Sequence, residues 1–190
     1  SANPIANLER DNEKMERERL DMNLSLDAKL CKLLTYQFKA SYYSVHRTDD
    51  NFFEVCGLDE DFVMPSSLTT VDKFQRHIRK WEINNLLTFM WQNDHHSLTI
   101  LAGQTAEGYK NSWHHSKRSG TPSNEEHYHY LSSAYTGDKA YGLDRDWTSI
   151  GLIGRVNYSY NDTYLFQANV RADGSSMFAK GNRWGVFPSV

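Results

Sequence analysis

The sequence predicts an all-β fold made of antiparallel up-and-down hairpins, and three observations predict it. Apolar and polar residues alternate with a period of two through six segments of about ten residues. Neighbouring segments join through short turns into three hairpins. Long polar connections separate the hairpins, and this asymmetry of long and short connections is typical of outer-membrane barrels. We therefore expect antiparallel hairpins of a transmembrane β-barrel.

The three hairpins are predicted at residues 20–42, 81–105 and 149–173. In the first, an apolar residue alternates with a polar one from Leu20 to Asp27, and the alternation resumes from Leu34 to Tyr42. Such alternation gives a strand one apolar and one polar face. Residues 28–33 form the expected turn of this hairpin.

The third hairpin has the clearest pattern. Leu152, Val156 and Tyr158 share one face of its first strand, and Asn161-Asp162 turns the chain. Phe166 and Val170 are then expected on the same face of the second strand. A seventh strand is expected to begin within residues 184–190.

Two long connections, roughly residues 47–79 and 106–147, lie between the hairpins. Loops of this length are uncommon in compact domains and are usually functional. We expect them on the extracellular side, with the short turns on the periplasmic side. Residues 66–80 start with a Ser/Thr cap and space their apolar residues near helical intervals, which predicts a short surface helix or irregular structure.

The two faces of the hairpins differ in chemistry. The apolar face ends in aromatic residues, whereas the opposite face carries Lys, Arg, Asn, Gln and Asp. Aromatic girdles at both membrane interfaces and a watery lumen account for this distribution in a barrel. A soluble β-sandwich that acts as a carbohydrate-binding module has the same periodicity and stays open as the alternative. Strands longer than about five or six residues favour the barrel.

Composition narrows the functional classes. The 190 residues carry a net charge of −3, so the sequence lacks the excess positive charge that is typical of nucleic-acid-binding proteins. Hydrophobic residues make up 39% and aromatic residues 13%, which suits apolar side chains spread along one face of many strands. No apolar run approaches the roughly 18 residues of a transmembrane helix. The opening SANPIANLER lacks the basic and apolar regions of a signal peptide.

Aromatic residues of the second connection are the candidate contacts for a ligand or partner. Six lie there: Trp113, Tyr128, Tyr130, Tyr135, Tyr141 and Trp147. Flat apolar rings beside polar groups suit stacking on sugars or on the surface of a partner. The other interpretation is that these rings pack the loop itself or form the interfacial girdle.

Histidines form a second cluster. His127 and His129 are spaced as a metal-binding pair on one face of a strand would be, while His95 and His96 fall in a short turn. No cysteine or carboxylate completes a recognisable metal spacing, and nothing matches a nucleophile elbow, P-loop, zincin or paired-carboxylate motif. We expect no catalytic, cofactor-binding or metal-binding residue, and no enzymatic activity.

The two cysteines are expected to stay unpaired. Cys31 falls in a short turn and Cys56 in the first long connection. In a barrel these positions lie at opposite ends of the wall, tens of Å apart at about 3.3 Å per strand residue. A disulfide needs Cα atoms within about 7 Å of each other.

The most specific motif lies in residues 154–190, which read GRVNYSYNDTYLFQANVRADGSSMFAKGNRWGVFPSV. This ordered string closely resembles a signature of the SusC/RagA-like TonB-linked outer-membrane proteins of Bacteroidetes. The run WEINNLLTFMWQNDHHSLTILAGQT is similar to a strand–turn–strand of the same family, and ANPIANL resembles its Asn-Pro element. Within the signature, Asp173-Gly174 is expected at a strand-end turn or bulge, and Arg171 shares a face with Asp173 and is placed to pair with it.

This resemblance implies both an architecture and a function. Family members have a plug domain and a barrel of about 22 strands; residues 1–190 contain neither a plug nor a TonB-contact segment and are expected to be a single segment of barrel wall. The resemblance thus implies that the hairpins are an excerpt, of about six to seven strands, from a large transmembrane β-barrel. The resemblance implies a Gram-negative outer-membrane location and energised uptake of a glycan or similar large nutrient. The implied partners are the TonB system acting through the plug of the parent protein, a surface lipoprotein of the SusD type, the nutrient and outer-membrane lipid. The resemblance supplies no ligand-binding residue.

Overall fold

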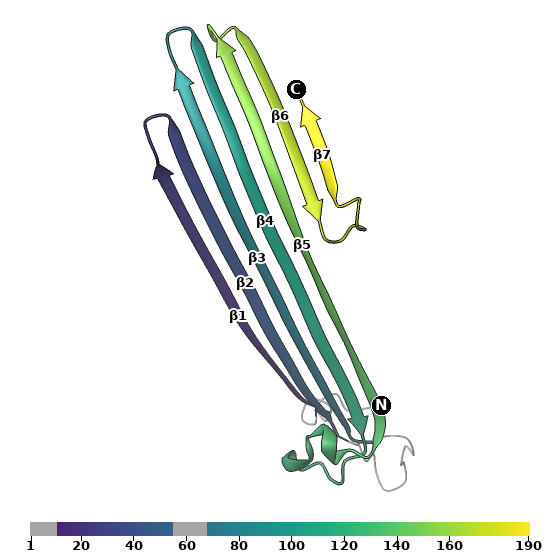
Figure 1. Cartoon of the computed structure of the whole chain (residues 1–190). Coiled ribbons are helices and arrows are strands. Elements are labelled where there is room, and N and C mark those ends of the chain that lie inside the picture. The colour runs from purple at the N-terminus through teal and green to yellow at the C-terminus, as the bar shows by residue number, and fades with distance from the viewer. Residues whose placement is uncertain (1–10, 55–67) are drawn as a thin grey trace, which may run out of the picture. The chain divides into compact units, whose positions relative to one another are not determined.

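The computed structural model describes residues 11–54 and 68–190. Strands dominate, and they are β1 (Asp11–Lys29), β2 (Leu34–Phe53), β3 (Thr70–Gln92), β4 (His96–Ser119), β5 (Thr136–Tyr160), β6 (Tyr164–Ser175) and β7 (Trp184–Ser189). They form one sheet in the order β1-β2-β3-β4-β5-β6-β7, so each strand pairs with its sequence neighbour (Figure 1). The predicted fold class of up-and-down hairpins is therefore confirmed. The ANPIANL element lies outside the described residues.

Only two short helices occur in the part of the chain that the structure describes. They are the 3-10 helices η1 (Glu126–Tyr128) and η2 (Leu131–Ser133), both between β4 and β5. No helix within residues 11–54 and 68–190 is long and apolar enough to cross a membrane.

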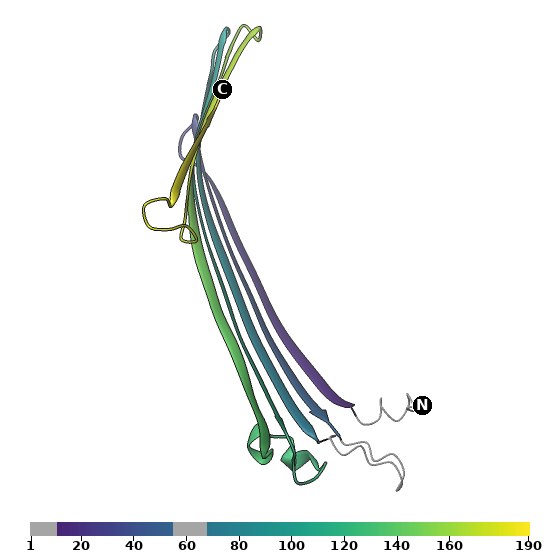
Figure 2. The same ribbon diagram turned by 90° about the vertical axis from the view of Figure 1, so that its right-hand side faces the viewer.

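The described residues divide into two compact units. Unit 1 comprises residues 11–19, 45–54, 68–78 and 111–144, and unit 2 comprises residues 20–44, 79–110 and 145–190. Figure 2 shows the strands of each unit side by side in a single layer. A β-sandwich needs two packed sheets, whereas the seven described strands belong to one sheet. The sandwich alternative is therefore not supported.

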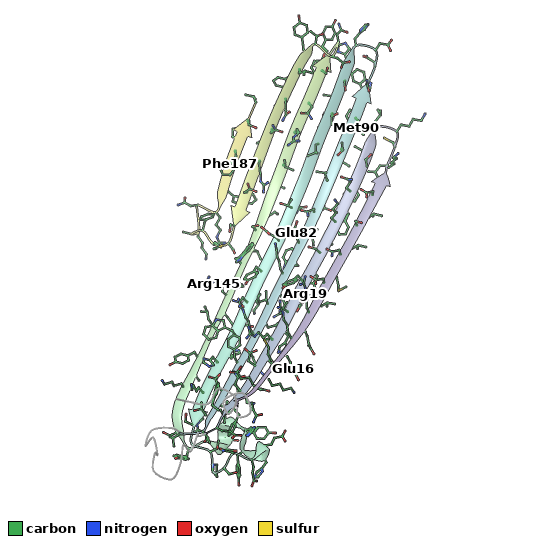
Figure 3. All side chains as sticks on the ribbon, turned by 180° about the vertical axis from the view of Figure 1, so that it is seen from behind. Glu16, Arg19, Glu82, Met90, Arg145 and Phe187 are labelled. Carbon is green, nitrogen blue, oxygen red and sulfur yellow. The ribbon has the colours of Figure 1, made fainter. Side chains whose placement is uncertain are left out.

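The register of unit 2 confirms the predicted faces of the third hairpin. Leu152 lies opposite Ala172, and Tyr158 lies opposite Phe166. Directly opposed residues of an antiparallel pair share a face, so the apolar residues of β5 and β6 line one surface. The polar residues line the other surface, where Arg155 Nε donates to Asn169 Oδ1 at 2.6 Å. Figure 3 shows side chains along the strands, including the labelled Glu82 and Met90 of β3.

Apolar side chains of unit 2 lie mostly on its surface rather than in a core. Four alternate residues of β1 are between 50% and 62% exposed: Leu20, Met22, Leu24 and Leu26. A single sheet has no second layer to cover such residues, so an apolar solvent or a further protein layer must do so.

Short polar turns close the hairpins of unit 2. At the β3–β4 turn, Asn93 Oδ1 accepts hydrogen bonds from the backbone N–H groups of His95 (3.0 Å) and His96 (2.7 Å). At the β5–β6 turn, Asn161 and Asp162 adopt positive φ values of 49° and 50°. Asn and Asp enter this left-handed region more readily than other non-glycine residues, which explains their place in the turn.

Unit 1 is polar and has a small core of its own. Val45, Phe52, Val71 and Ala134 are its buried apolar residues among those described. Ion pairs accompany them, including Lys73–Asp50 at 3.0 Å. The backbone N–H of Thr121 donates to the buried Thr69 hydroxyl at 2.7 Å, which ties the β4–β5 connection to the start of β3.

Two predictions about the long connections are wrong in their bounds. Strands extend far into both regions: β2 continues to Phe53 and β3 begins at Thr70, while β4 continues to Ser119 and β5 begins at Thr136. The helix predicted at 66–80 is also wrong from residue 70 onward, because Thr70 begins β3; residues 66 and 67 lie outside the described part of the chain. Val71 and Phe74 are three residues apart, which matches helical spacing but places them on opposite faces of a strand.

Candidate functional site

An aromatic strip crosses three neighbouring strands of unit 1. It consists of Phe74 on β3, Trp113 and His115 on β4, and Tyr141 on β5. The Phe74 ring centroid lies 6.2 Å from those of Trp113 and His115, and His115 lies 6.3 Å from Tyr141. These separations fall in the range of interacting aromatic pairs, so the four rings form one continuous surface.

Polar groups hold the aromatic strip in place. His115 Nε2 lies 3.0 Å from Asp72 Oδ1, which joins β4 to β3. The guanidinium carbon of Arg47 lies 5.8 Å from the Phe74 ring centroid, a cation–π distance. Arg47 also donates to both carboxylate oxygens of Asp49, at 2.7 Å and 2.6 Å. This hydrogen bonding raises the pKa of Arg47 above its ordinary value, so the residue stays charged.

A separate aromatic pair lies in unit 2. Trp147 of β5 stacks on Tyr109 of β4 with ring centroids 5.9 Å apart. In the same unit Ser149 Oγ donates to Glu107 Oε1 at 2.8 Å, and Lys80 Nζ lies 3.8 Å from the other oxygen of Glu107. Trp147 is therefore a strand residue with a stacked partner rather than a free loop aromatic.

Tyr130 lines a polar hollow of about 690 Å³ in unit 1. The hollow has an aromatic side where His129 stacks on the buried Phe52, with ring centroids 3.6 Å apart. Lys73 and Asp50, which pair with each other, also line it. The tyrosine itself is 62% exposed.

The last two predicted aromatics pack against their own connection. Tyr128 lies beside His127 with ring centroids 3.9 Å apart. Tyr135 lies over Gly120, where a β-carbon would come 2.5 Å from the tyrosine ring, and the φ of this glycine is +81°. The structure thus brings Trp113 and Tyr141 together and separates Tyr128, Tyr130, Tyr135 and Trp147 from them.

Four side chains of the candidate site were not predicted from the sequence. Phe74, Asp72 and Arg47 fall in the first predicted loop, and His115 falls in the second. The sequence of β4 contained a signal for His115, because large side chains occupy alternate positions there, as on one face of a strand: Tyr109, Asn111, Trp113 and His115.

The histidine and cysteine predictions have mixed outcomes. His127 and His129 do not share a strand face, because residues 126–128 form η1. Residues 11–54 and 68–190 contain no group of three His, Cys, Asp or Glu side chains placed to hold a metal ion. Cys31 is a free, exposed thiol, and Cys56 lies outside the described residues.

The predicted pairing within the terminal signature is confirmed. Arg171 Nε donates to both carboxylate oxygens of Asp173, at 2.9 Å and 2.7 Å. Asp173 lies opposite Gly151 in the β5–β6 register, on the polar face. The side chains of this pair are 57% and 37% exposed, so water screens it.

Comparison with known sequences gives partial matches to receptors. No family model matches the chain. It is 54% identical to the TonB-dependent receptor SusC of Bacteroides thetaiotaomicron over 43 residues, which is 23% of this chain and 4% of that protein. It is 30% identical to the TonB-dependent receptor P3 of Formosa agariphila over 105 residues, or 55% of this chain and 10% of the receptor. The chain thus spans only a small part of the curated relatives that it matches.

Comparison with solved structures covers nearly the whole chain. The structure of the RagAB peptide transporter matches with a TM-score of 0.82 and 17% identity. The match covers 95% of this chain and 20% of the transporter chain. The RagAB peptide importer in its "open-open" state matches with a TM-score of 0.81 and 18% identity. At this identity the likeness establishes a shared fold.

Proposed function

The chain belongs to the SusC/RagA-like TonB-linked outer-membrane proteins, the family that its motifs resemble, and from this premise we propose that it forms part of the barrel wall of a nutrient importer. Its location is accordingly the outer membrane of a Gram-negative cell. The proteins that it matches are named as receptors, transporters or importers rather than enzymes. We propose that the chain itself has no catalytic role.

Two aromatic belts on the apolar face of unit 2 are the observation that carries this proposal. On β3, Trp81 and Trp91 are separated by ten sequence positions, which correspond to roughly 33 Å along a strand. A strand tilted by about 45° then spans about 23 Å across the bilayer, close to the apolar band of about 25 Å in outer-membrane barrels. The same spacing of ten positions separates Tyr164 from Gly174 on β6. Gly174 lies opposite Trp184, so an aromatic residue again occurs at each belt.

The residues between the belts suit contact with lipid. Ile83, Leu87 and Ile100 are exposed apolar residues within this band. Asn85 is a polar residue on the same face of β3, and its Oδ1 accepts a hydrogen bond from the Tyr36 hydroxyl at 2.6 Å. A polar group within a bilayer needs such a partner, so this pair supports the assignment of the face to lipid.

We place unit 1 outside the hydrocarbon, on the extracellular side. Asp72 and Lys73 are adjacent residues of β3 in this unit; Asp72 is hydrogen-bonded to His115, and Lys73 forms an ion pair with Asp50. Adjacent strand residues face opposite ways, so charge occupies both faces of β3 here. A charge on the lipid face is costly within the bilayer. The connections that follow β2 and β4 are then extracellular.

The aromatic strip is the proposed contact surface for the nutrient. Its half-buried Phe74, Trp113 and His115 and exposed Tyr141 present flat faces beside hydrogen-bonding groups, a combination that suits the faces and hydroxyl groups of sugars. We propose an oligosaccharide as the first candidate. A peptide is the second, because the structures that match 95% of this chain are those of a peptide transporter.

Transport depends on partners outside this chain. We propose that the TonB system supplies the force through the plug of the parent protein, and that a surface lipoprotein of the SusD type covers the barrel. No nucleic-acid partner is proposed.

Growth on defined nutrients tests the proposal. A strain that lacks the complete receptor is compared with its parent on single oligosaccharides, on single peptides and on monosaccharides. We expect loss of growth on one class of oligosaccharide and normal growth on monosaccharides. A defect on peptides alone would favour the second candidate, and normal growth on every large nutrient would contradict the proposal.

A further inference from the structure

A shallow groove of about 330 Å³ lies on the surface of unit 2 over β5, between two indole rings. Trp81 forms one wall and lies over Gly108 of β4, where a β-carbon would come 2.6 Å from Cε2 of the indole. Trp184 forms the other wall and lies over Gly174 of β6 in the same way, at 2.9 Å. The two indoles, which belong to β3 and β7, thus lie over β4 and β6, the two strands that pair with β5.

The floor of the groove between the two indoles is apolar. Ala106, Ile150 and Gly174 line it between the indoles, and hydroxyl-bearing residues complete the lining: Thr148, Ser149, Ser175 and Ser176. Ile150 lies directly opposite Gly174 in the β5–β6 register. The ends of the turn after β6 are fixed to β5: Ser176 N donates to Thr148 O, and Thr148 N donates to Ser176 Oγ, both at 2.9 Å. The groove is therefore preformed.

One cation stands at the rim. Of the described residues that line the groove, Arg183 is the only charged one, and no carboxylate accompanies it. Its Nε donates to the Phe178 carbonyl at 3.2 Å, which anchors the guanidinium across the turn. The two terminal nitrogens of this exposed side chain retain donors in the planar arrangement that recognises phosphate.

We propose that this groove binds one molecule of the lipid A type, with an acyl chain between Trp81 and Trp184 and a phosphate on Arg183. This inference rests on the proposed membrane placement of unit 2. The groove lies at the belt on the side of the long connections, where the outer leaflet of a Gram-negative outer membrane meets water. A groove with two indole walls, an apolar floor, hydroxyl groups and a single cation at headgroup level complements an acyl chain joined to an anionic headgroup.

The test uses the complete receptor purified from its own outer membrane in mild detergent. Lipid A that co-purifies is counted per receptor by mass spectrometry. Arg183→Gln removes the cation, and Ala106→Phe fills the groove while keeping it. We expect each to lower bound lipid A at least fivefold. Lys180→Gln, in the same turn but not lining the groove, is the matched control and should stay within twofold of the native receptor.

Delipidated receptor is then titrated with purified lipid A and, separately, with phosphatidylglycerol. Saturable binding of lipid A that Arg183→Gln weakens is expected. Equal lipid A in native, Arg183→Gln and Ala106→Phe receptors, or tighter binding of phosphatidylglycerol, would overturn the inference. Membrane insertion and nutrient uptake are measured on the same strains. A receptor that inserts and transports without bound lipid A overturns only this inference, whereas one absent from the outer membrane overturns the proposed function.

Discussion

The indole of Trp81 on β3 lies directly over Gly108 on β4, and a β-carbon at Gly108 would come 2.6 Å from its Cε2. Gly108 is buried beneath this ring, although it lies on a strand that has no second sheet above it. Glycine at this position lets a large aromatic ring lie flat against the sheet at the level of the proposed outer belt.

Gly108→Ala is expected to displace Trp81 from this position. Overpacking of this kind costs about 1–3 kcal/mol. The measurement is denaturant unfolding of the complete receptor in detergent, followed by the loss of the faster gel mobility of the folded barrel. Gly154→Ala is the control, because its β-carbon would meet only Val170 Cγ1 at 3.3 Å. Equal stability of the two variants would contradict the packing role of Gly108.

Two neighbouring residues of β6 test which face meets lipid. Ala168 lies opposite Val156 on the apolar face, and Gln167 lies opposite Asn157 on the polar face. Ala168→Arg is expected to destabilise the barrel by about 2–4 kcal/mol if it faces the bilayer centre, whereas Gln167→Arg, facing the lumen, should change stability by less than about 0.5 kcal/mol. The amount of folded receptor in the outer membrane gives the readout. The reverse order would assign the faces the other way.

The sequence predicts the part of each strand that has one apolar and one polar face. From Leu20 to Asp27, and again in β5 and β6, apolar and polar residues alternate, and the register of β5 and β6 follows the expected pairing. In the first nine residues of β1, by contrast, Met15 is the only large apolar residue. A strand with polar surroundings on both faces carries no apolar period. This is why the long connections were predicted too long.

The candidate site was predicted only in part, because it too lies on strand segments without an apolar period. Trp113 and Tyr141 were chosen as aromatic residues of one connection, and the structure places them in one strip. Phe74 and Asp72, however, come from another strand about 40 positions earlier in the chain. Their place beside Trp113 and His115 depends on the pairing of β3 with β4, and register in a polar strand is weakly specified by sequence alone.

Removing one ring from the aromatic strip should weaken nutrient binding. A stacked aromatic contributes about 0.5–1.5 kcal/mol, so Trp113→Ala is expected to raise Kd roughly 2- to 12-fold. Trp113→Phe keeps a flat ring and should recover part of the loss. Calorimetric titration of the complete receptor with its nutrient provides the values. Tyr130→Ala alters the polar hollow outside the strip, and a larger effect there than at Trp113 would move the binding surface to that hollow.

The Arg171–Asp173 pair should contribute little to stability despite its short distances. Both side chains are more than a third exposed, and exposed ion pairs are worth about 0–1 kcal/mol. A double-mutant cycle with Arg171→Ala and Asp173→Ala is therefore expected to give a coupling energy below about 1 kcal/mol. The denaturation assay used for Gly108 applies here. A coupling energy above about 2 kcal/mol would show that the barrel shields this pair from water.

The proposed sidedness of the chain can be read from the reactivity of thiols. Cys31 is exposed between β1 and β2, at the short-turn end, so a membrane-impermeant maleimide should label it only after the outer membrane is permeabilised. Ser132→Cys, in the β4–β5 connection, should react in intact cells, because this connection is proposed to be extracellular. Each thiol is examined alone, with Cys56→Ser in both strains and Cys31→Ser in the strain that carries Ser132→Cys. Labelling of Cys31 in intact cells, with protection of residue 132, would invert the proposed topology.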